Sequence, residues 1–410
     1  MDSKIIKNYF IAFFGLSLLF LMMVFISQLY AIKIILMILL LILTTKKIQL
    51  SYNVRIAFFL IIFYGVYGIF FGVIHQTENP FLFVTIYCVW PVLYLLYTSN
   101  FLIKHNYFTL IVKTIFYAHA FIVLYDLIFA WGIFAGVKVP NIYTVGTPFS
   151  IYLNATRMNF VNLNSLTFST PVLFILFIGR FDLGISRKFQ VLILFFTFFL
   201  FIISGRRSVI LIVLLLPLIP LVFSNRFSKQ IKKNLIRGTL IVLFLFISTF
   251  FYLNKNNPEF ISNYTQVFLK AFDTEKEPIK FAQQKMLMEK FEEKPLFGHG
   301  SGCMFYEPAP GRMMFANQFE LSYHLKLAFT GIIGFLIIIG VYVWILLYGL
   351  FLARKKNDLL FLSFLGGYFF MLIADATNPV LCSFDLIWPI YLCLAKINYW
   401  ELNNSNPVFE

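Results

Sequence analysis

The sequence predicts an all-α, polytopic membrane protein with about twelve transmembrane helices and one large loop late in the chain. Of its 410 residues, 60% are hydrophobic and only 12% are charged, whereas soluble proteins carry about 25% charged residues. The mean hydropathy is +0.84. Apolar runs of about 20 residues, the length that crosses a bilayer, recur along the chain. These observations exclude a soluble globular protein.

Twelve apolar segments account for the predicted helices. The first follows a short basic stretch, has the length of a span and lacks a small-residue cleavage site, so we expect a retained helix rather than a cleaved signal. The stretch 190–224 is too long for one span and suits two short ones, which places Arg206 and Arg207 in a tight turn at one membrane face. The segments lie at roughly 9–27, 30–45, 56–74, 81–99, 107–135, 161–179, 189–204, 208–224, 236–253, 326–351, 358–375 and 379–397.

Basic residues in the short loops predict the orientation. With the N-terminus inside, the inner segments and their flanks hold 19 lysines and arginines, and the short outer loops hold five. Under the positive-inside rule, both termini are cytoplasmic. The net charge of +15 then reflects topology and not nucleic-acid binding.

This topology divides the chain into three parts. Residues 1–253 hold nine helices with short loops, residues 254–325 form the large outer loop, and residues 326–410 hold three helices and a cytoplasmic tail. A second outer segment, 136–160, is rich in Pro, Gly and Asn.

The large loop contains a predicted amphipathic helix, KEPIKFAQQKMLMEKFEEKP. Pro278 suits a first helical turn and Pro295 ends the helix. A helix lying at the bilayer surface and a lid packed on the bundle both remain open. The residues that its spacing places on one apolar face are Ile279, Ala282, Met286 and Phe291.

Outer cations predict an anion site. Arg157, Arg206 and Arg207 lie in short outer loops, and Lys280 and Arg312 lie in the large loop. A guanidinium fork matches phosphate oxygens, so a converging set would hold a pyrophosphate. The alternative is that each cation snorkels to lipid headgroups or pairs with a loop carboxylate.

A glycine-rich segment, PLFGHGSG, follows the predicted loop helix. Gly298, His299 and Gly300 would let backbone amides approach and cradle an anion. The alternative is an ordinary turn after a helix.

Glu320 and His324 open the tenth predicted span. Four residues apart, they would share a helix face, and either could act as a general base toward a sugar hydroxyl. The alternative is an N-terminal glutamate that interacts with the helix dipole. Weaker candidates for binding sugar hydroxyls are Asp126, Asp375, Asn378 and Asp385.

Missing motifs narrow the chemistry. We find no Walker motif, DxD cluster or HExxH, and the four cysteines have no CxxC spacing, so we expect no metal or cofactor. Cys303 and Cys382 are either two separate thiols or a pair on the outer side. Because the inner loops are too short for a nucleotide-sugar domain, a glycosyl donor would come from the membrane or the outer side.

The order of these features resembles the bacterial O-antigen polymerases (Wzy family) and the O-antigen ligases. The shared pattern is about twelve spans, a large late periplasmic loop, outer arginines before it, a PLxGxGxG turn and a GxxG helix start. The turn is matched by residues 295–302 and the helix start by residues 331–334. Ligases place a His-Asn pair where this chain has Glu320-Leu321, and an Arg near the position of Lys280. These departures favour a polymerase.

The resemblance implies a GT-C-like glycosyltransferase of the bacterial inner membrane, with its active site facing the periplasm. It would transfer the growing glycan from undecaprenyl pyrophosphate to the non-reducing end of a new lipid-linked repeat unit, without a metal or cofactor. The outer arginines and Lys280 would hold the pyrophosphate, and Glu320 or His324 would be the base. A chain-length regulator is the implied protein partner. The alternatives are a ligase that uses lipid A-core, a flippase or sugar exporter, and a non-catalytic scaffold.

Overall fold

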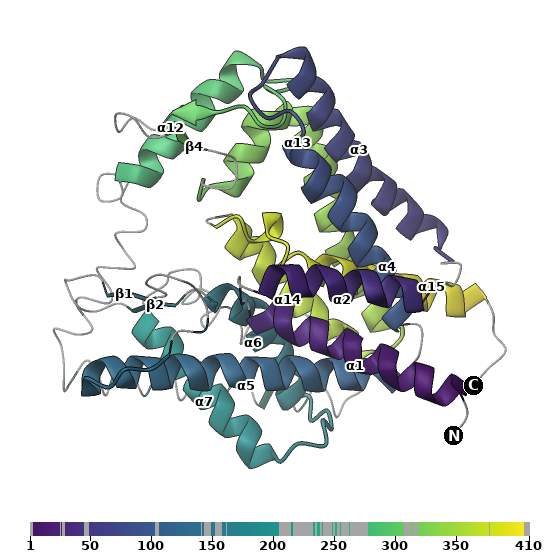
Figure 1. Ribbon diagram of the computed structural model, residues 1–410, viewed down its shortest axis with the longest axis vertical. Coiled ribbons are helices and arrows are strands. Elements are labelled where there is room, and N and C mark those ends of the chain that lie inside the picture. Colours follow the sequence, from purple (N-terminus) through teal and green to yellow (C-terminus); the bar gives the residue numbers. More distant parts are fainter. Residues whose placement is uncertain are drawn as a thin grey trace. The chain divides into compact units, whose positions relative to one another are not determined.

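A computed structural model provides the fold. It describes residues 3–24, 26, 29–44, 49–102, 106–140, 142, 149–151, 158–160, 162–204, 278–306, 313–314, 319–376 and 378–405, with isolated residues between 215 and 262. The described chain is predominantly helical (Figure 1). It separates into two compact units, and each draws on three separate stretches of the sequence.

Unit 1 comprises Met1–Leu43, Lys104–Phe272 and Ala353–Phe370. Within it, α1 packs along α5 and against α2, and α5 also packs on α6 and α7. Nearly every residue of α6 is buried, so α6 is the central helix of this unit. Its elements are α1 (Ser3–Val24), α2 (Tyr30–Leu43), α5 (Asn106–Ala135), β1 (Phe149–Ile151), β2 (Met158–Phe160), α6 (Leu163–Ile178), α7 (Arg187–Ser204) and the first part of α14 (Leu359–Asp375).

Unit 2 comprises Thr44–Ile103, Asp273–Leu352 and Met371–Glu410. Here α15 packs on α4 and α3, and the π-helix η2 joins α3 to α4. Its elements are α3 (Tyr52–Ile74), η2 (Val84–Val89), α4 (Trp90–Leu102), α12 (Pro278–Glu293), β3 (Phe305–Tyr306), β4 (Met313–Met314), most of α13 (Ser322–Lys355), η6 (Val380–Cys382) and α15 (Trp388–Ser405).

Three of the described helices are long and apolar enough to cross a membrane: α3, α5 between Tyr107 and Gly132, and α13. Shorter apolar helices lie at Tyr9–Val24, Tyr30–Leu43, Val84–Ser99, Leu163–Ile178 and Leu359–Asp375. The predicted helical fold is confirmed for the described residues, and these apolar helices are compatible with the predicted membrane protein. Only isolated residues of the two predicted spans 208–224 and 236–253 are described, so a count of twelve stays a prediction.

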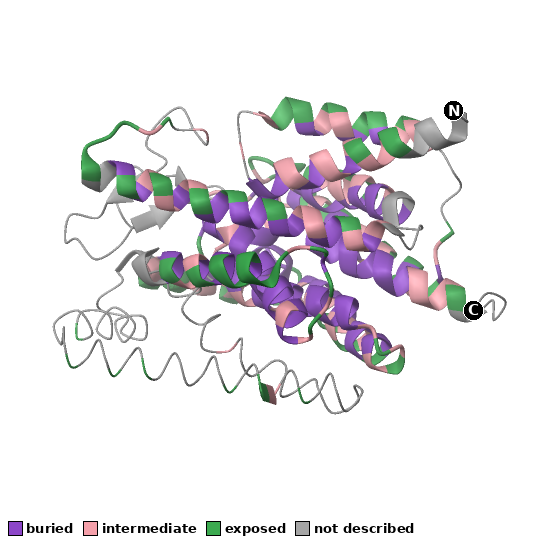
Figure 2. Ribbon diagram, turned by 90° about the horizontal axis from the view of Figure 1, so that it is seen from below, coloured by how far each residue is buried: buried purple, intermediate pink, exposed green. Residues whose placement is uncertain are grey.

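The surface of the helices agrees with a lipid-facing protein. Figure 2 shows helices whose exposed residues follow one side and whose buried residues follow the other. Large apolar side chains dominate the exposed positions, for example Phe59, Phe195 and Leu336 at 60–64% exposure. Because such residues would be costly in water, this surface fits a bilayer.

The structure departs from the sequence prediction in three places. Two short antiparallel strand pairs, β1–β2 and β3–β4, interrupt the all-helical pattern. The last predicted span, 379–397, begins with the short 3-10 helix η6, and α15 starts only at Trp388. The tenth, 326–351, is longer than expected and is interrupted at Gly331, where φ is 59° and ψ is −171°. An apolar run predicts that a segment is removed from water, but it does not predict where the helix backbone is interrupted.

Candidate functional site

The interruption of α13 is filled by the glycine-rich turn 295–302. The carbonyls of Ala328 and Phe329, which the break releases from the helix, accept hydrogen bonds from the amides of His299 (3.1 Å) and Gly300 (2.8 Å). Unpaired backbone groups are very costly at membrane depth. The turn therefore replaces the helix's own hydrogen bonds.

The same exchange occurs on the other side of Gly331. The amide of Ile332 donates to the carbonyl of Pro295 (2.8 Å), and the amide of Ile333 donates to that of Leu296 (3.3 Å). The two motifs that the sequence singled out, PLFGHGSG and GIIG, are thus the two sides of one backbone contact.

The far side of the turn docks on the end of α3. The amide of Ser301 donates to the carbonyl of Gly68 (2.8 Å), and the hydroxyl of Thr77 donates to the carbonyl of Ser301 (2.7 Å). At Gly300, where φ is +92°, an added Cβ would lie 2.1 Å from the amide nitrogen of Gly72. Only glycine allows this close approach of two backbones.

This geometry gives Gly298, His299 and Gly300 a role different from the expected anion cradle. The amide of Gly298 donates to the carbonyl of Lys294 (2.9 Å), and the next three amides donate to the carbonyls already described. Because each amide has one proton, none of them is available to an anion in this conformation. The turn joins α3, α12 and α13.

The imidazole of His299 completes this junction. Its Nε2 lies 2.8 Å from the carbonyl oxygen of Lys290, near the end of α12, and 3.4 Å from Oε2 of Glu293. Burial lowers the pKa of His299, although the hydrogen bond to the Lys290 carbonyl and the Glu293 carboxylate act in the opposite direction. A neutral ring that donates Nε2–H to the carbonyl fits this environment.

The predicted loop helix is confirmed as α12, from Pro278 to Glu293. Its most buried residues are Gln283 and Leu287, at 1% and 0% exposure. The expected apolar face is shifted, because Ala282, Met286 and Phe291 are only partly buried; the side chain of Ile279 lies outside the described residues. The buried Gln283 accepts, at its Oε1, a hydrogen bond from the amide of Glu320 (3.2 Å).

An ion pair connects α12 to the segment before α13. Nζ of Lys280 lies 3.1 Å from Oε2 of Glu320, and the two side chains are 34% and 50% exposed. A predicted phosphate ligand and a predicted base are therefore neighbours. Both remain accessible, which a site for a large substrate requires.

His324 is not part of this pair. Glu320 precedes the first residue of α13, Ser322, so the two side chains do not form the helix-face pair that their spacing suggested. His324 is half-buried, and its Nδ1 has no hydrogen-bond partner among the described residues.

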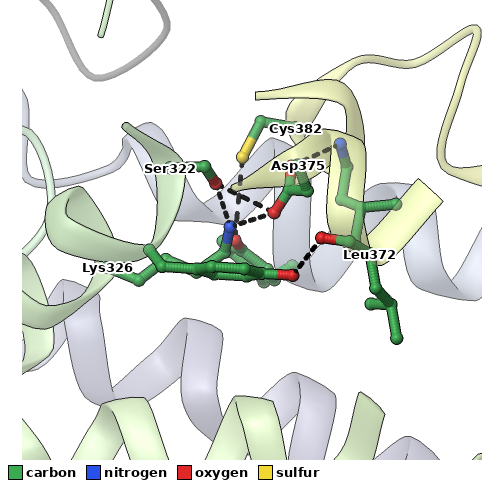
Figure 3. A network of polar contacts seen from close by, with 8 residues as sticks. Ser322, Lys326, Leu372, Asp375 and Cys382 are labelled. Atoms are coloured by element: carbon green, nitrogen blue, oxygen red, sulfur yellow. Dashed lines mark hydrogen bonds and ion pairs between the residues drawn. The ribbon is translucent and has the colours of Figure 1, made fainter. Parts of the chain in front are cut away.

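A second ion pair lies deeper at the start of α13 (Figure 3). Nζ of Lys326 lies 2.8 Å from Oδ2 of Asp375, which also accepts the hydroxyl of Ser322 at 2.9 Å. Oδ1 of Asp375 accepts the amide of Leu381 at 3.0 Å. The ammonium also lies 5.3 Å from the centre of the Tyr323 ring, within cation–π range.

This cluster gives Asp375 a structural role. Both carboxylate oxygens have protein partners, so Asp375 joins helices instead of offering itself to sugar hydroxyls. Lys326 was not among the predicted site residues. The sequence does place this lysine inside the apolar run LKLAFTG. A charged residue within a membrane span is usually paired with another polar group, so this position could have been predicted.

Other predicted site residues are distributed as follows. Asp126 lies in unit 1 and is buried, and Asp385 is buried in unit 2. Cys303 and Cys382 carry free thiols, and burial, followed by the Glu78 carboxylate, raises the pKa of Cys303 to about 11. Four predicted cations lie outside the described residues: Arg157, Arg206, Arg207 and Arg312.

Comparison with known proteins gives no family assignment: no protein-family model matches the chain, and no curated protein matches it.

Proposed function

We propose that this protein polymerises lipid-linked oligosaccharides at the periplasmic face of the bacterial inner membrane. The donor would be a glycan on undecaprenyl pyrophosphate, and the acceptor a new lipid-linked repeat unit. The acceptor hydroxyl oxygen attacks the anomeric carbon of the donor, the bond from that carbon to the pyrophosphate breaks, and the hydroxyl proton passes to a base.

The observation that carries this proposal is the accessible contact between Lys280 and Glu320. It puts a group that binds phosphate 3.1 Å from a group that accepts a proton. In acyl- or glycosyl-transfer sites, a positioned carboxylate acts as a general base, and fixed cations stabilise a leaving anion.

The ion pair also supports an order of events. In the free protein, Lys280 holds one oxygen of Glu320. An arriving pyrophosphate carries more charge than a carboxylate and competes for the ammonium. Exchange of Lys280 onto the phosphate then frees the Glu320 oxygen to accept the proton of the acceptor hydroxyl. The base becomes available when the donor is bound.

The junction around the glycine-rich turn would hold Lys280 and Glu320 in a fixed position relative to each other. Lys280 lies on α12, whose end is tied to the turn through His299, and the turn is tied to α13. Gln283 on α12 also binds the amide of Glu320. Position matters because small displacements of reacting groups are costly to catalysis.

A transporter of lipid-linked sugars is the second candidate. The interrupted helix α13 and the buried pair Lys326–Asp375 favour it, since broken helices and intramembrane charges are common in transporters. It gives no role to the accessible pair Lys280–Glu320.

One assay separates the candidates. Purified full-length protein is reconstituted in liposomes with lipid-linked repeat units and no nucleotide, and the products are resolved by size. A ladder of longer glycans supports the polymerase. Transfer only after lipid A-core is added indicates a ligase. Movement of the lipid-linked unit across the bilayer without a new covalent product would replace the proposal with transport.

A further inference from the structure

A line of polar side chains crosses the buried interface between α5 and α6 in unit 1. At one end, Nδ2 of Asn162 lies 3.4 Å from Oδ1 of Asp126. At the other end, Nδ1 of His119 lies 2.7 Å from Oγ of Ser169. The residues on each helix are seven apart, so both contacts fall on one line, about 10 Å apart along α5. We call this line the α5–α6 polar seam.

Asp126 is the acidic end of the seam. Its side chain is 2% exposed, and its Oδ2 has no hydrogen-bond partner among the described residues. The contact with Asn162 is long for a hydrogen bond. A charged carboxylate at this position would be desolvated, and the single long contact would compensate little of that cost.

Among the side chains that the structure describes, the helices packed on α5 place no cation in an ion pair with Asp126. The described part of α6 has no titratable side chain, and that of α1 from Tyr9 to Val24 has only Tyr9. On α7, Arg187 and Lys188 lie in the first turn, and Arg187 donates to the carbonyl of Phe177 near the opposite end of α6.

Two further titratable groups belong to α5 itself and to α2. Tyr125, the neighbour of Asp126, donates its hydroxyl proton to the carbonyl of Pro140 (2.6 Å). The buried Lys33 belongs to α2, which packs on α1. The start of α6 at Leu163 contributes the partial positive charge of a helix N-terminus, which is weaker than a cation.

Asp375 in unit 2 shows what an ionised buried aspartate has in this protein. Lys326, Ser322 and the amide of Leu381 all donate to its oxygens. Asp126 has a single amide contact. An un-ionised carboxylic acid is therefore the form that the site of Asp126 favours.

The His119 end of the seam allows two arrangements of its protons. The hydroxyl of Ser169 donates to the carbonyl of Ser165 (3.1 Å), and that of Thr197, which contacts the other ring nitrogen at 2.7 Å, donates to the carbonyl of Ile193 (2.7 Å). Each hydroxyl has one proton, and a neutral imidazole has one N–H. One hydroxyl must therefore turn toward the ring, and the two choices differ only in where protons lie.

We propose that Asp126 carries a proton in the resting protein and that the α5–α6 polar seam is a site of reversible proton binding. The seam then has an acid at one end and a tautomeric imidazole at the other. Ser165 lies between them on α6, and its hydroxyl oxygen has no hydrogen-bond partner in the described structure. This inference does not depend on the reaction proposed above.

Infrared difference spectroscopy of the full-length protein in lipid tests it. At neutral pH, the wild type should show a carboxylic acid C=O band that shifts in deuterium oxide and is lost in Asp126→Asn. Asp182→Asn is the matched control, because Asp182 is exposed and accepts the amide of Gly184 (2.7 Å); it should keep the band. Failure of Asp126→Asn to remove any acid band would overturn the proposal.

Thermal unfolding across pH gives a second, independent readout. A folded state that holds a proton which the unfolded chain releases loses stability as pH rises. The wild type should therefore lose stability relative to Asp126→Asn as pH rises from about 4, the pKa of an unfolded aspartate, to alkaline values. If Asp126→Asn is instead the less stable protein there, and sodium or calcium raises the melting temperature of the wild type alone, the site holds a metal cation and the proposal fails.

Discussion

Lys326 and Asp375 form a buried ion pair 49 residues apart in the sequence, with 2.8 Å between Nζ and Oδ2. Their side chains are 4% and 0% exposed. Lys326 lies one turn into α13, and Asp375 is the last residue of α14. Since neither charge has access to water, each depends on the other to remain inside the protein.

Removing one partner should be strongly destabilising. Lys326→Met leaves the Asp375 carboxylate buried without its cation, and we expect a loss of about 3–5 kcal/mol in the free energy of unfolding. Denaturant titration in detergent measures it. Lys285→Met is the control, because Lys285 is an exposed residue of α12 whose loss should cost within about 0.5 kcal/mol. Equal stability of the two variants would show that the buried pair contributes nothing.

The double variant separates the pair from its burial. Lys326→Met with Asp375→Leu leaves no buried charge, so it should be more stable than Lys326→Met alone. Replacement of a buried pair by apolar residues is often close to neutral. A double variant less stable than either single variant would contradict this account.

The backbone contact between the glycine-rich turn and α3 should be intolerant of a methyl group. Gly300→Ala places a Cβ 2.1 Å from the amide nitrogen of Gly72 at φ +92°, and we expect a loss of well over about 1 kcal/mol. Gly340→Ala, a helical position on α13 with no atom within 4 Å of the new Cβ, is the matched control and should change stability little. Thermal unfolding of both variants compares them.

His299 should make the turn sensitive to acid. Burial lowers its pKa, so below about pH 6.5 the unfolded chain takes up a proton that the folded protein resists. Stability should fall as pH drops from about 6.5. In His299→Gln, whose amide can still donate to the carbonyl of Lys290, this part of the pH dependence should disappear. Parallel stability curves for wild type and variant would exclude His299 as the source.

Lys280 should matter for activity and little for stability. Its ion pair with Glu320 is partly exposed, and such pairs contribute at most about 1 kcal/mol. Lys280→Ala should therefore fold normally but bind the lipid-pyrophosphate donor more weakly, raising KM. Lys285→Ala on the same helix should keep the wild-type KM. Equal KM values for both variants would remove Lys280 from the donor site.

Apolar periodicity predicts most of this fold because burial of apolar side chains determines where helices form. Prolines 278 and 295 gave the limits of α12 for the same local reason. The break at Gly331 was not predictable, because it depends on carbonyls and amides of a turn that begins 36 residues earlier. The partner of Lys326 is still more distant in the sequence, 49 residues away. Glu320 and Lys280 were each predicted from charge and position, but their contact required the fold.

The rate of glycan extension by Glu320→Gln tests the central claim most directly. Initial rates of ladder formation are measured in liposomes with lipid-linked repeat units, with Glu289→Gln as the matched control, since Glu289 is an exposed carboxylate on α12 that pairs with Lys285 at 3.9 Å. Loss of a general base should slow extension about 10²–10⁴-fold, with protein abundance unchanged and the control at the wild-type rate. Extension by Glu320→Gln at the rate of Glu289→Gln would contradict the account.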